Sequence, residues 1–239
     1  MSGHSKWHKV KHQKAVTDAR KGKIFSKMAK IIAIAARKGG DPEMNPSLRM
    51  AIDRAKDVNM PKDKIDKAIK KGTGEDKEGQ LEEAMYEAYG PEGSQLIIEI
   101  ITDNKNRTLA ELRHILGQYG GQLAENGSVK WNFAQKGIAR INIGKMEDKE
   151  EIELEIIDSG ADDFKWDNNN LEVYTSPENL TNLKSSLEKK GFAVEDSGLE
   201  WVAKNEISLD GGNKDKIEGL FDALDENEDV KDIYSNINL

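Results

Sequence analysis

Basic side chains crowd the first 38 residues of the chain and are the strongest chemical signal in the sequence. This segment carries 11 lysine and arginine residues against one acid, Asp18. Such cations bind phosphates and release condensed counterions, which gives nucleic-acid binding most of its affinity. The pattern predicts that a phosphate backbone is followed by Lys6, Lys9, Lys11, Lys14, Arg20, Lys21, Lys23, Lys27, Lys30, Arg37 and Lys38. The alternative is a solvated basic tail that binds nothing.

Flat side chains lie among these cations. Trp7, His8 and His12 are of types that stack on bases, so we add them to the predicted nucleic-acid contacts. His4, His8 and His12 are also spaced four residues apart and would share one face of a helix, as metal ligands can. However, no carboxylate or cysteine lies among them, and the dense positive charge disfavours a metal cation. We therefore expect no metal site here.

A second, weaker candidate is the segment Thr102–Thr108, with the sequence TDNKNRT, at an expected strand-to-helix junction. The N-terminus of a helix can hold an anion, and Lys105 and Arg107 add positive charge there. Asn, Asp and Thr at such a junction also satisfy the first amides of the helix. Lys105 and Arg107 are thus secondary anion-site candidates, with helix capping as the simpler interpretation.

No set of residues has the composition of a catalytic centre. The chain has no cysteine, which excludes disulfides, a thiol nucleophile and cysteine-ligated metals. His114 lies in an apolar-striped helical segment, and the pair Asp162 and Asp163 lacks a histidine or second acidic cluster. The glycine pairs at 72–74 and 90–93 match no phosphate-binding loop and are expected to be turns. We expect a protein that is not an enzyme, with no cofactor and no small-molecule substrate.

Charge is divided unequally along the chain, although the net charge is only −8. Residues 1–72 carry 19 basic and 7 acidic residues, a net of +12, whereas residues 73–239 carry 17 and 37, a net of −20. An acidic body repels nucleic acid, so binding is expected to be confined to the basic end. A different class of function also fits this division, namely an acidic protein-interaction scaffold with the basic arm as a secondary feature.

The N-terminal part of the chain, which contains the basic residues, is predicted to be an arm followed by helices. Residues 1–23 are polar and are expected to form a basic arm, either extended or a loosely held helix. From Ile24 apolar residues recur at helical spacing up to Gly39-Gly40, with Arg37 and Lys38 in the last turn. Asn45-Pro46 and Pro61 are typical helix starts, and Gly72 is a typical end. Residues 24–78 are therefore predicted to be a helical bundle.

The remainder of the chain has the pattern of two α+β domains. A strand at 95–102, a helix opened by a capping box at Thr108 and a strand at 128–133 are followed by a β-α-β-β-α-β order. That order is typical of a ferredoxin-like domain, predicted at 136–204. A strand at 206–209, a helix at 214–227 and a strand at 230–234 complete a discontinuous domain, 79–135 plus 205–239. The fold class is thus α+β and multidomain, with the ferredoxin-like domain inserted into the other.

Segments that would direct the chain to or through a membrane are not evident. The longest apolar run, Ile31–Ala36, is far shorter than the roughly 20 residues of a membrane helix. The N-terminus lacks the apolar stretch of a signal peptide. We expect no membrane partner.

Several motifs, in order and at consistent spacing, resemble those of the YebC/PmpR family. They are Ser2–Trp7 (SGHSKW), Lys11-His12, Asp18–Lys23 (DARKGK), Gly39–Pro42 (GGDP), Asn45-Pro46, Asn59–Pro61 (NMP), Thr102–Thr108, Gly120-Gly121 and Gly127–Val129 (GSV). The resemblance covers nearly the whole chain. Two positions depart from the usual pattern, with Lys105 where arginine is common and Ala124 where glycine is usual, and neither change removes a charge.

The resemblance implies a helical N-terminal domain followed by two α+β domains, one inserted into the other. It also implies a cytoplasmic bacterial protein, since the motif begins directly after Met1 and leaves no room for a mitochondrial presequence. The family includes probable DNA-binding transcriptional regulators and a mitochondrial translational activator of cytochrome c oxidase. Other members look like ribosome-associated factors that help translation through proline runs.

Two functions are therefore expected as alternatives to the scaffold. The first is a DNA-binding regulator of transcription that uses the basic N-terminal segment. The second is a translation factor that binds ribosomal RNA and relieves stalling. No segment has Asn, Gln and Arg arrayed as a recognition helix, and this favours contact with backbone shape over the reading of bases. Neither the residues nor the resemblance selects DNA or RNA, a sequence preference or an oligomeric state.

Overall fold

The chain forms two compact units in the computed structural model, which describes residues 18–75, 80–143, 148–167, 170–208 and 214–238. One unit contains residues 18–129 and 214–233, and the other contains residues 130–208 and 234–238. In its described part, the first unit combines three N-terminal helices with a four-stranded sheet and two further helices. Most of the second unit, residues 130–208, lies in the sequence between the two parts of the first.

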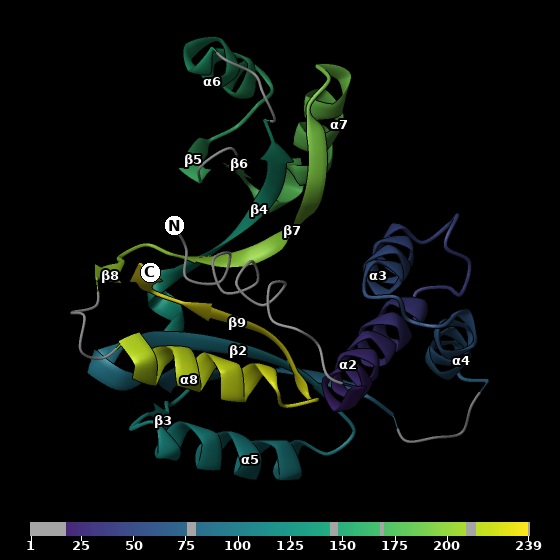
Figure 1. Ribbon diagram of the computed structural model, residues 1–239, viewed down its shortest axis with the longest axis vertical. Helices are drawn as coiled ribbons and strands as arrows, with labels where there is room; N and C mark the ends of the chain where they lie inside the picture. Colours follow the sequence, from purple (N-terminus) through teal and green to yellow (C-terminus); the bar gives the residue numbers. More distant parts are fainter. Residues whose placement is uncertain (1–17, 76–79, 144–147, 168–169, 209–213, 239) are drawn as a thin grey trace. The chain divides into compact units, whose positions relative to one another are not determined.

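Three helices form the N-terminal part of the first unit: α2 (Asp18–Ala36), α3 (Pro46–Asp57) and α4 (Lys62–Thr73) (Figure 1). Their apolar faces meet in a core that includes Ile32, Leu48 and Ile65. Asn45 caps α3 as expected, since its Oδ1 accepts from the Leu48 amide at 3.1 Å. Its Nδ2 donates to the carbonyl oxygens of Ala35 and Gly39, both at 2.8 Å, and so fixes the turn between α2 and α3.

Two details of these helices differ from the prediction. The helix expected from Ile24 also includes residues 18–23. These residues lack the apolar stripe on which the prediction relied, but Ala, Arg and Lys among them are good helix formers. The helix ends at Ala36, so Arg37 and Lys38 lie beyond its last turn.

Gly72 is not a turn residue as predicted. It lies inside α4, which is closed by Gly74 in the left-handed conformation at φ 82°. A Cβ at Gly72 would overlap the carbonyl oxygen of Ala33 and approach the Cβ of Ala36 to 2.7 Å. Gly72 therefore allows α4 to pack closely against α2.

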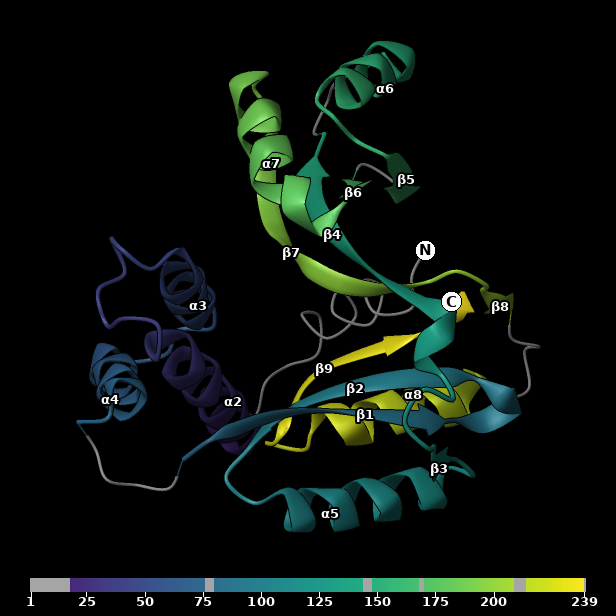
Figure 2. The same ribbon diagram turned by 180° about the vertical axis from the view of Figure 1, so that it is seen from behind.

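The α+β part of the first unit is a sheet in the order β3-β1-β2-β9. Its strands are β1 (Glu82–Tyr89), β2 (Gln95–Thr102), β3 (Gln122–Leu123) and β9 (Val230–Ser235). The helices α5 (Lys105–Gln118) and α8 (Lys214–Asp225) contact each other. In Figure 1 α8 lies in front of β2, and in Figure 2 it lies behind β1 and β2, so it covers one face of the sheet.

The strand β1 was missed in the sequence. Its residues, EEAMYEAY, are rich in Glu and Ala, which favour helices over strands. Antiparallel pairing with the apolar strand β2 along its whole length, from Glu82 opposite Thr102 to Tyr89 opposite Gln95, overrides that preference.

The strand predicted at 128–133 was also wrong. Residues up to Val129 form a turn, Lys130–Asn132 form a short 3-10 helix (η2), and the strand β4 begins at Phe133. The buried Glu87 carboxylate accepts from the amides of Gly127 and Val129, both at 2.6 Å, and holds this turn. The helix predicted from Thr108 begins three residues earlier, with Asn104 as its N-cap.

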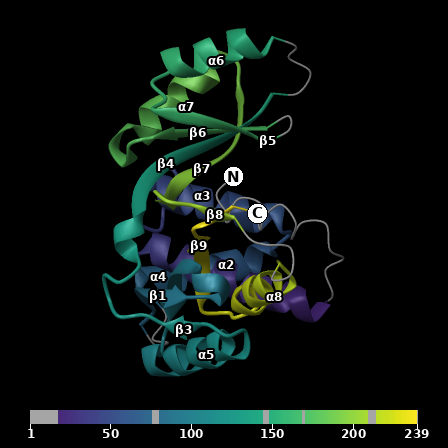
Figure 3. The same cartoon turned by 90° about the vertical axis from the view of Figure 1, so that its left-hand side faces the viewer.

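The second unit has the predicted ferredoxin-like order. Its elements are β4 (Phe133–Asn142), α6 (Lys149–Asp158), β5 (Asp163–Asp167), β6 (Asn170–Thr175), η3 (Pro177–Asn179), α7 (Leu180–Lys189) and β7 (Ala193–Ala203). The strands pair antiparallel in the order β5-β6-β4-β7. Figure 3 shows α6 and α7 on one side of this sheet, where Ile141, Ile156 and Leu183 form the core. The short β8 (Ile207–Ser208) pairs with β10 (Ile237–Asn238) and joins neither larger sheet.

A charged cluster stabilises the centre of the ferredoxin-like sheet. Arg140 alternates with the core residues Ala139 and Ile141 along β4 and therefore faces away from the helices. Its guanidinium donates to Glu172 at 3.0 Å and to Glu200 at 2.6 and 2.9 Å. Burial lowers the pKa of Arg140, but the hydrogen bond and charge of Glu200 outweigh it and raise this pKa above its ordinary value. These contacts tie together β4, β6 and β7.

Asp229 connects the helical and α+β parts of the first unit. It lies between α8 and β9, and its side chain is only 4% exposed. One carboxylate oxygen accepts from Lys30 of α2. The other accepts from Arg107 at 2.8 Å, and from the hydroxyls of Thr108 at 2.6 Å and Thr102 at 3.0 Å. Ala33 of α2 also packs against Leu81 and Ile101, so apolar contact supports the ionic one.

Gly72→Ala is expected to destabilise the protein by about 1–3 kcal/mol, because the added methyl group overlaps the backbone of α2. The matched control is Gly117→Ala in α5, where a Cβ would meet nothing within 4 Å. That change should be neutral or stabilising by up to about 1 kcal/mol through helix propensity. Urea unfolding of both variants measures the difference, and equal stabilities would contradict the close approach of α4 and α2.

Asp229→Asn is expected to reduce the free energy of unfolding by about 3 kcal/mol, because it leaves Lys30 and Arg107 without their shared counter-charge. Asp53→Asn is the control, since Asp53 pairs with Lys56 on an exposed surface and should cost less than about 1 kcal/mol. Chemical denaturation at pH 7 compares the two. A loss no larger than that of the control would show that Asp229 does not hold the two parts together.

The stabilising effect of Asp229 should also depend on pH. Burial raises the pKa of Asp229, but the hydrogen bonds from Arg107, Lys30 and Thr108 outweigh it and lower the pKa from 3.8 to about 2. A carboxyl group with a lowered folded-state pKa stabilises fully above its unfolded pKa and loses that effect as pH falls through the folded value. The stability difference between the wild type and Asp229→Asn should therefore narrow as pH falls from about 4 toward about 2. A difference that stays constant over that range would contradict this assignment.

Candidate nucleic-acid interface

Much of the predicted nucleic-acid segment lies outside the described residues. This applies to Lys6, Trp7, His8, Lys9, Lys11, His12 and Lys14. Arg20 belongs to α2, but its side chain is not among those described. The assignment of these residues stays a prediction from the sequence.

The lysines of α2 that follow are engaged within the first unit. Lys27 is buried, and its ammonium donates to both the side chain and the backbone carbonyl of Asp225 at 2.8 Å. Lys30 donates to the Asp229 carboxylate and to the carbonyl oxygen of Glu228, the latter at 3.0 Å. The acids lie almost 200 residues away in sequence, so the pattern of α2 alone gave no sign of them. As placed, Lys27 and Lys30 stabilise the fold instead of facing a phosphate backbone.

The remaining predicted cations of the helical part are more accessible. Lys21 and Lys23 are exposed, and Lys23 forms a loose ion pair of 3.6 Å with Glu226. Arg37 and Lys38 are exposed after the end of α2, and the Arg37 guanidinium donates to the carbonyl oxygen of Leu81. These four side chains follow α2 from its first turns to its end and are exposed at the surface.

The secondary anion candidates, Lys105 and Arg107, already have carboxylate partners. Lys105 lies 2.5 Å from Glu82, and this hydrogen bond raises the pKa of its ammonium group. Arg107 contacts Asp229 at 2.8 Å and Asp103 at 3.0 Å, and the hydrogen bond to Asp229 raises its pKa. Asn104 Oδ1 accepts from the Arg107 amide at 3.1 Å, so the junction is capped in the way the simpler interpretation expected.

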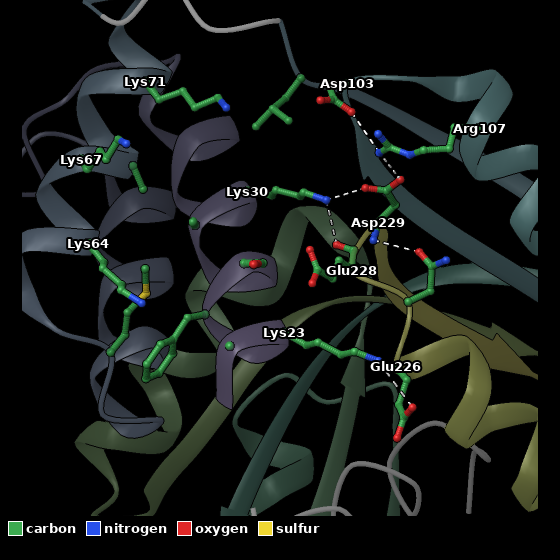
Figure 4. A pocket seen from close by; sticks show the side chains of 18 of the residues that line it. Lys23, Lys30, Lys64, Lys67, Lys71, Asp103, Arg107, Glu226, Glu228 and Asp229 are labelled. Carbon is green, nitrogen blue, oxygen red and sulfur yellow. Dashed lines mark hydrogen bonds and ion pairs between the residues drawn. The ribbon is translucent and has the colours of Figure 1, made fainter. Parts of the chain in front are cut away.

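A recess in the first unit contains cations that the sequence reasoning missed. It has a volume of about 780 Å³ and is bounded by α2, α4, the start of α5 and residues 226–229. We call it the α4 recess. Figure 4 shows Lys64, Lys67 and Lys71 following one another along α4, opposite Arg107 and Asp229. Their spacing of three and four residues places them on one helix face, a signal that the apolar stripe of the same helix concealed.

The walls of the α4 recess differ in charge. The α4 wall carries three lysines, whereas the far walls carry Asp103, Glu111, Glu226, Glu228 and Asp229. Most of those acids are paired with Lys23, Lys30 or Arg107. The lysine wall can therefore attract an anion, while the opposite side offers hydrogen-bond acceptors.

Within the described part of the chain, no group of three or more His, Asp or Glu residues is arranged to hold a metal ion. Among the helices that the structure describes, none is both long enough and apolar enough to cross a membrane.

The sequence and fold were compared with those of known proteins. The family model for the TACO1/YebC protein N-terminal domain matches residues 5–75, and that for the TACO1/YebC second and third domain matches residues 81–237. A relative from Thermosipho melanesiensis is 47% identical, and one from Pseudothermotoga lettingae is 45% identical. Each alignment covers 100% of this chain and 94% of the relative, and each relative is named a probable transcriptional regulatory protein.

A solved structure is also similar. The crystal structure of a conserved hypothetical protein from Aquifex aeolicus matches with a TM-score of 0.81 and 38% sequence identity. The match covers 92% of this chain and 91% of that protein. The motifs, the order of the elements and these matches agree, and the chain belongs to the TACO1/YebC family.

Proposed function

We propose that this protein is a regulator of gene expression that binds nucleic acid through its basic N-terminal segment and has no enzymatic activity. The single observation that carries the proposal is the division of charge, with a net of +12 over residues 1–72 and −20 over residues 73–239. A basic end on an acidic body orients the protein toward a polyanion. The names of the relatives from Thermosipho and Pseudothermotoga support a role in the regulation of transcription.

The accessible cations of the helical part support the same proposal. Lys21, Lys23 and Lys38 lie at or near the ends of α2 and extend the basic surface beyond residues 1–17. Lys27 and Lys30 are left out of this surface because their ammonium groups are held by Asp225 and Asp229. Binding of this kind needs no metal or cofactor, and it places the protein in the cytoplasm, where bacterial nucleic acid is found.

A second candidate is a translation factor that binds ribosomal RNA. It is favoured by the surface of α3, where the exposed Asp53 and Asp57 lie among Arg49, Arg54 and Lys56. The helix α3 contains no Asn or Gln, the side chains that pair with adenine in the major groove, so it is poorly suited to act as a recognition helix. Contact with phosphates and overall shape, without base reading, suits folded RNA.

Replacing Lys6, Lys9, Lys11 and Lys14 by Glu is expected to abolish nucleic-acid binding by the full chain while leaving the two units folded. The change adds four negative charges where phosphates are contacted and removes four cations. Fluorescence anisotropy with labelled duplex DNA and with labelled RNA measures the loss, and circular dichroism checks the fold. Affinity of the wild type should also fall steeply with salt.

The control replaces Lys184, Lys189, Lys214 and Lys216 by Glu, which changes the net charge equally in α7 and α8. Its affinity should stay within a few-fold of the wild type, apart from the general effect of charge. If the arm variant binds as well as this control, or if wild-type binding does not respond to salt, the assignment of the basic arm is wrong. If the wild type binds neither DNA nor RNA, the scaffold alternative is preferred.

A further inference from the structure

The helix α6 of the ferredoxin-like unit carries apolar side chains on two opposite sides. Figure 3 shows α6 on the helical side of the sheet, and Ile152 and Ile156 are buried in the core between them. Leu154 and Ile157, in contrast, are 64% and 54% exposed. Residues three apart are neighbours on a helix surface, so these two side chains form one apolar patch that the unit itself does not cover.

Carboxylates flank this apolar patch. At about 3.6 residues per turn, the side of α6 opposite the core carries Glu150, Glu151, Leu154, Ile157 and Asp158 within roughly a third of a turn. We call these five residues the outer face of α6. All five are exposed, and none of them is a cation.

The negative charge of the outer face is not balanced locally. Lys149 is the one base of α6, and its ammonium lies elsewhere, 4.9 Å from the centre of the Trp166 ring. Within the described part of the chain, no lysine or arginine forms an ion pair with Glu150, Glu151 or Asp158. The outer face is therefore both apolar and acidic.

The sign of this charge restricts what can cover the apolar patch. Carboxylates repel nucleic acid and anionic lipid surfaces. A second copy of the same face, related by two-fold symmetry, would bring like charges together. A basic protein segment, in contrast, gains from both parts of the face. Its apolar side chains would bury Leu154 and Ile157, while its lysine and arginine side chains would contact the flanking acids.

We propose that the outer face of α6 binds a protein segment rich in lysine and arginine, which presents apolar side chains to Leu154 and Ile157. An apolar centre with a polar rim is the usual anatomy of a protein interface. The ten residues of α6 span about 15 Å, so the contact is small and reversible, with an affinity on the order of micromolar. The inference goes beyond the proposed function, because it adds a protein partner and does not depend on nucleic-acid binding.

Three labelled peptides serve as probes for the full chain. The first consists of lysine and leucine, with the leucines three and four positions apart, and has about 18 residues so that a helix can form. The second replaces each leucine by serine and keeps the charge. The third replaces each lysine by glutamate and keeps the apolar residues. Only the first should bind with micromolar affinity, and equal binding of either of the others, or no binding of the first, overturns the proposal.

The apolar patch is tested with Leu154→Ser/Ile157→Ser. This variant should bind the first peptide about tenfold more weakly than the wild type, because the centre of an interface contributes most of its binding energy. Leu199→Ser is the control, since Leu199 is an exposed leucine of β7 in the same unit, 46% exposed. Fluorescence anisotropy measures both affinities, and circular dichroism checks the fold. Equal affinities of the two variants overturn the assignment of the patch.

The flanking acids are tested with Glu150→Gln/Glu151→Gln. The control is Glu178→Gln/Glu188→Gln, which changes the net charge equally at exposed positions outside α6. The outer-face variant should lose several-fold more affinity for the first peptide than the control, and the difference should shrink as salt rises. An equal loss would mean that the peptide binds to the acidic body in general, and it overturns the proposal.

A photo-crosslinking amino acid at Leu154, in the full chain and in cells of its own host, identifies the natural occupant. A captured segment rich in lysine and arginine, lost in the Glu150→Gln/Glu151→Gln variant, supports the proposal. Capture of nucleic acid, of a second copy, of an acidic segment or of nothing overturns it. The outer-face variants should bind DNA and RNA like the wild type. Absence of nucleic-acid binding by the wild type would therefore overturn the proposed function alone.

Discussion

The position of one carboxylate, that of Asp229, determines how the first unit is assembled. Lys30 comes from α2, Arg107 and Thr108 come from α5, and Thr102 ends β2. Side chains from α2, α5 and the end of β2 therefore meet at one buried acid that lies more than 100 residues further along the chain. A buried carboxylate is tolerated only when its charge and its lone pairs are satisfied, and the hydrogen bonds from Arg107, Lys30 and Thr108 lower the pKa of Asp229 and so favour its ionised form. The α4 recess exists because this contact holds α2 and its companion α4 beside the start of α5.

The contacts of Asp225 and Asp229 with α2 reduce the number of lysines in the basic N-terminal segment that can face a polyanion. In the sequence, the lysines of α2 are continuous with those of the arm and suggest one surface for polyanions. In the structure, Lys27 and Lys30 face acids of the α8–β9 junction and are removed from that surface. The acids of this junction thus shield part of α2, while α4 offers lysines of its own.

The ferredoxin-like unit also contains a charged side chain, Arg140, whose charge is balanced by partners on neighbouring strands. Arg140 is surrounded by Glu172, Glu200 and Asp196, so one cation is shared by three acids on adjacent strands. Burial raises the pKa of Tyr174, whose hydroxyl donates to Glu172 and completes the cluster. The surplus of carboxylates keeps this unit acidic. An acidic unit repels phosphates, which agrees with the proposal that nucleic acid binds at the basic N-terminal segment.

The sequence by itself determined the local elements whose residues carry their own signals. Asn45-Pro46 specifies the start of α3, the apolar stripe of α2 specifies its core face, and the alternation of strands and helices specifies the ferredoxin-like order. The sequence alone also determined the division of charge along the chain, because charge depends only on residue type. Motifs at fixed spacing also sufficed to identify the family.

Only the tertiary structure determined the features that depend on contacts between residues far apart in the sequence. The strand β1 forms because β2 pairs with it, although its Glu- and Ala-rich residues favour a helix. The turn before β4 exists because Glu87 binds the amides of Gly127 and Val129. In the sequence, Lys27 cannot be distinguished from the other lysines of the basic segment. In the structure, its ammonium group lies 2.8 Å from the Asp225 carboxylate. Pairing, burial and ion-pair geometry are properties of chain segments brought together, so no local pattern could assign which lysines stabilise the fold and which face a ligand.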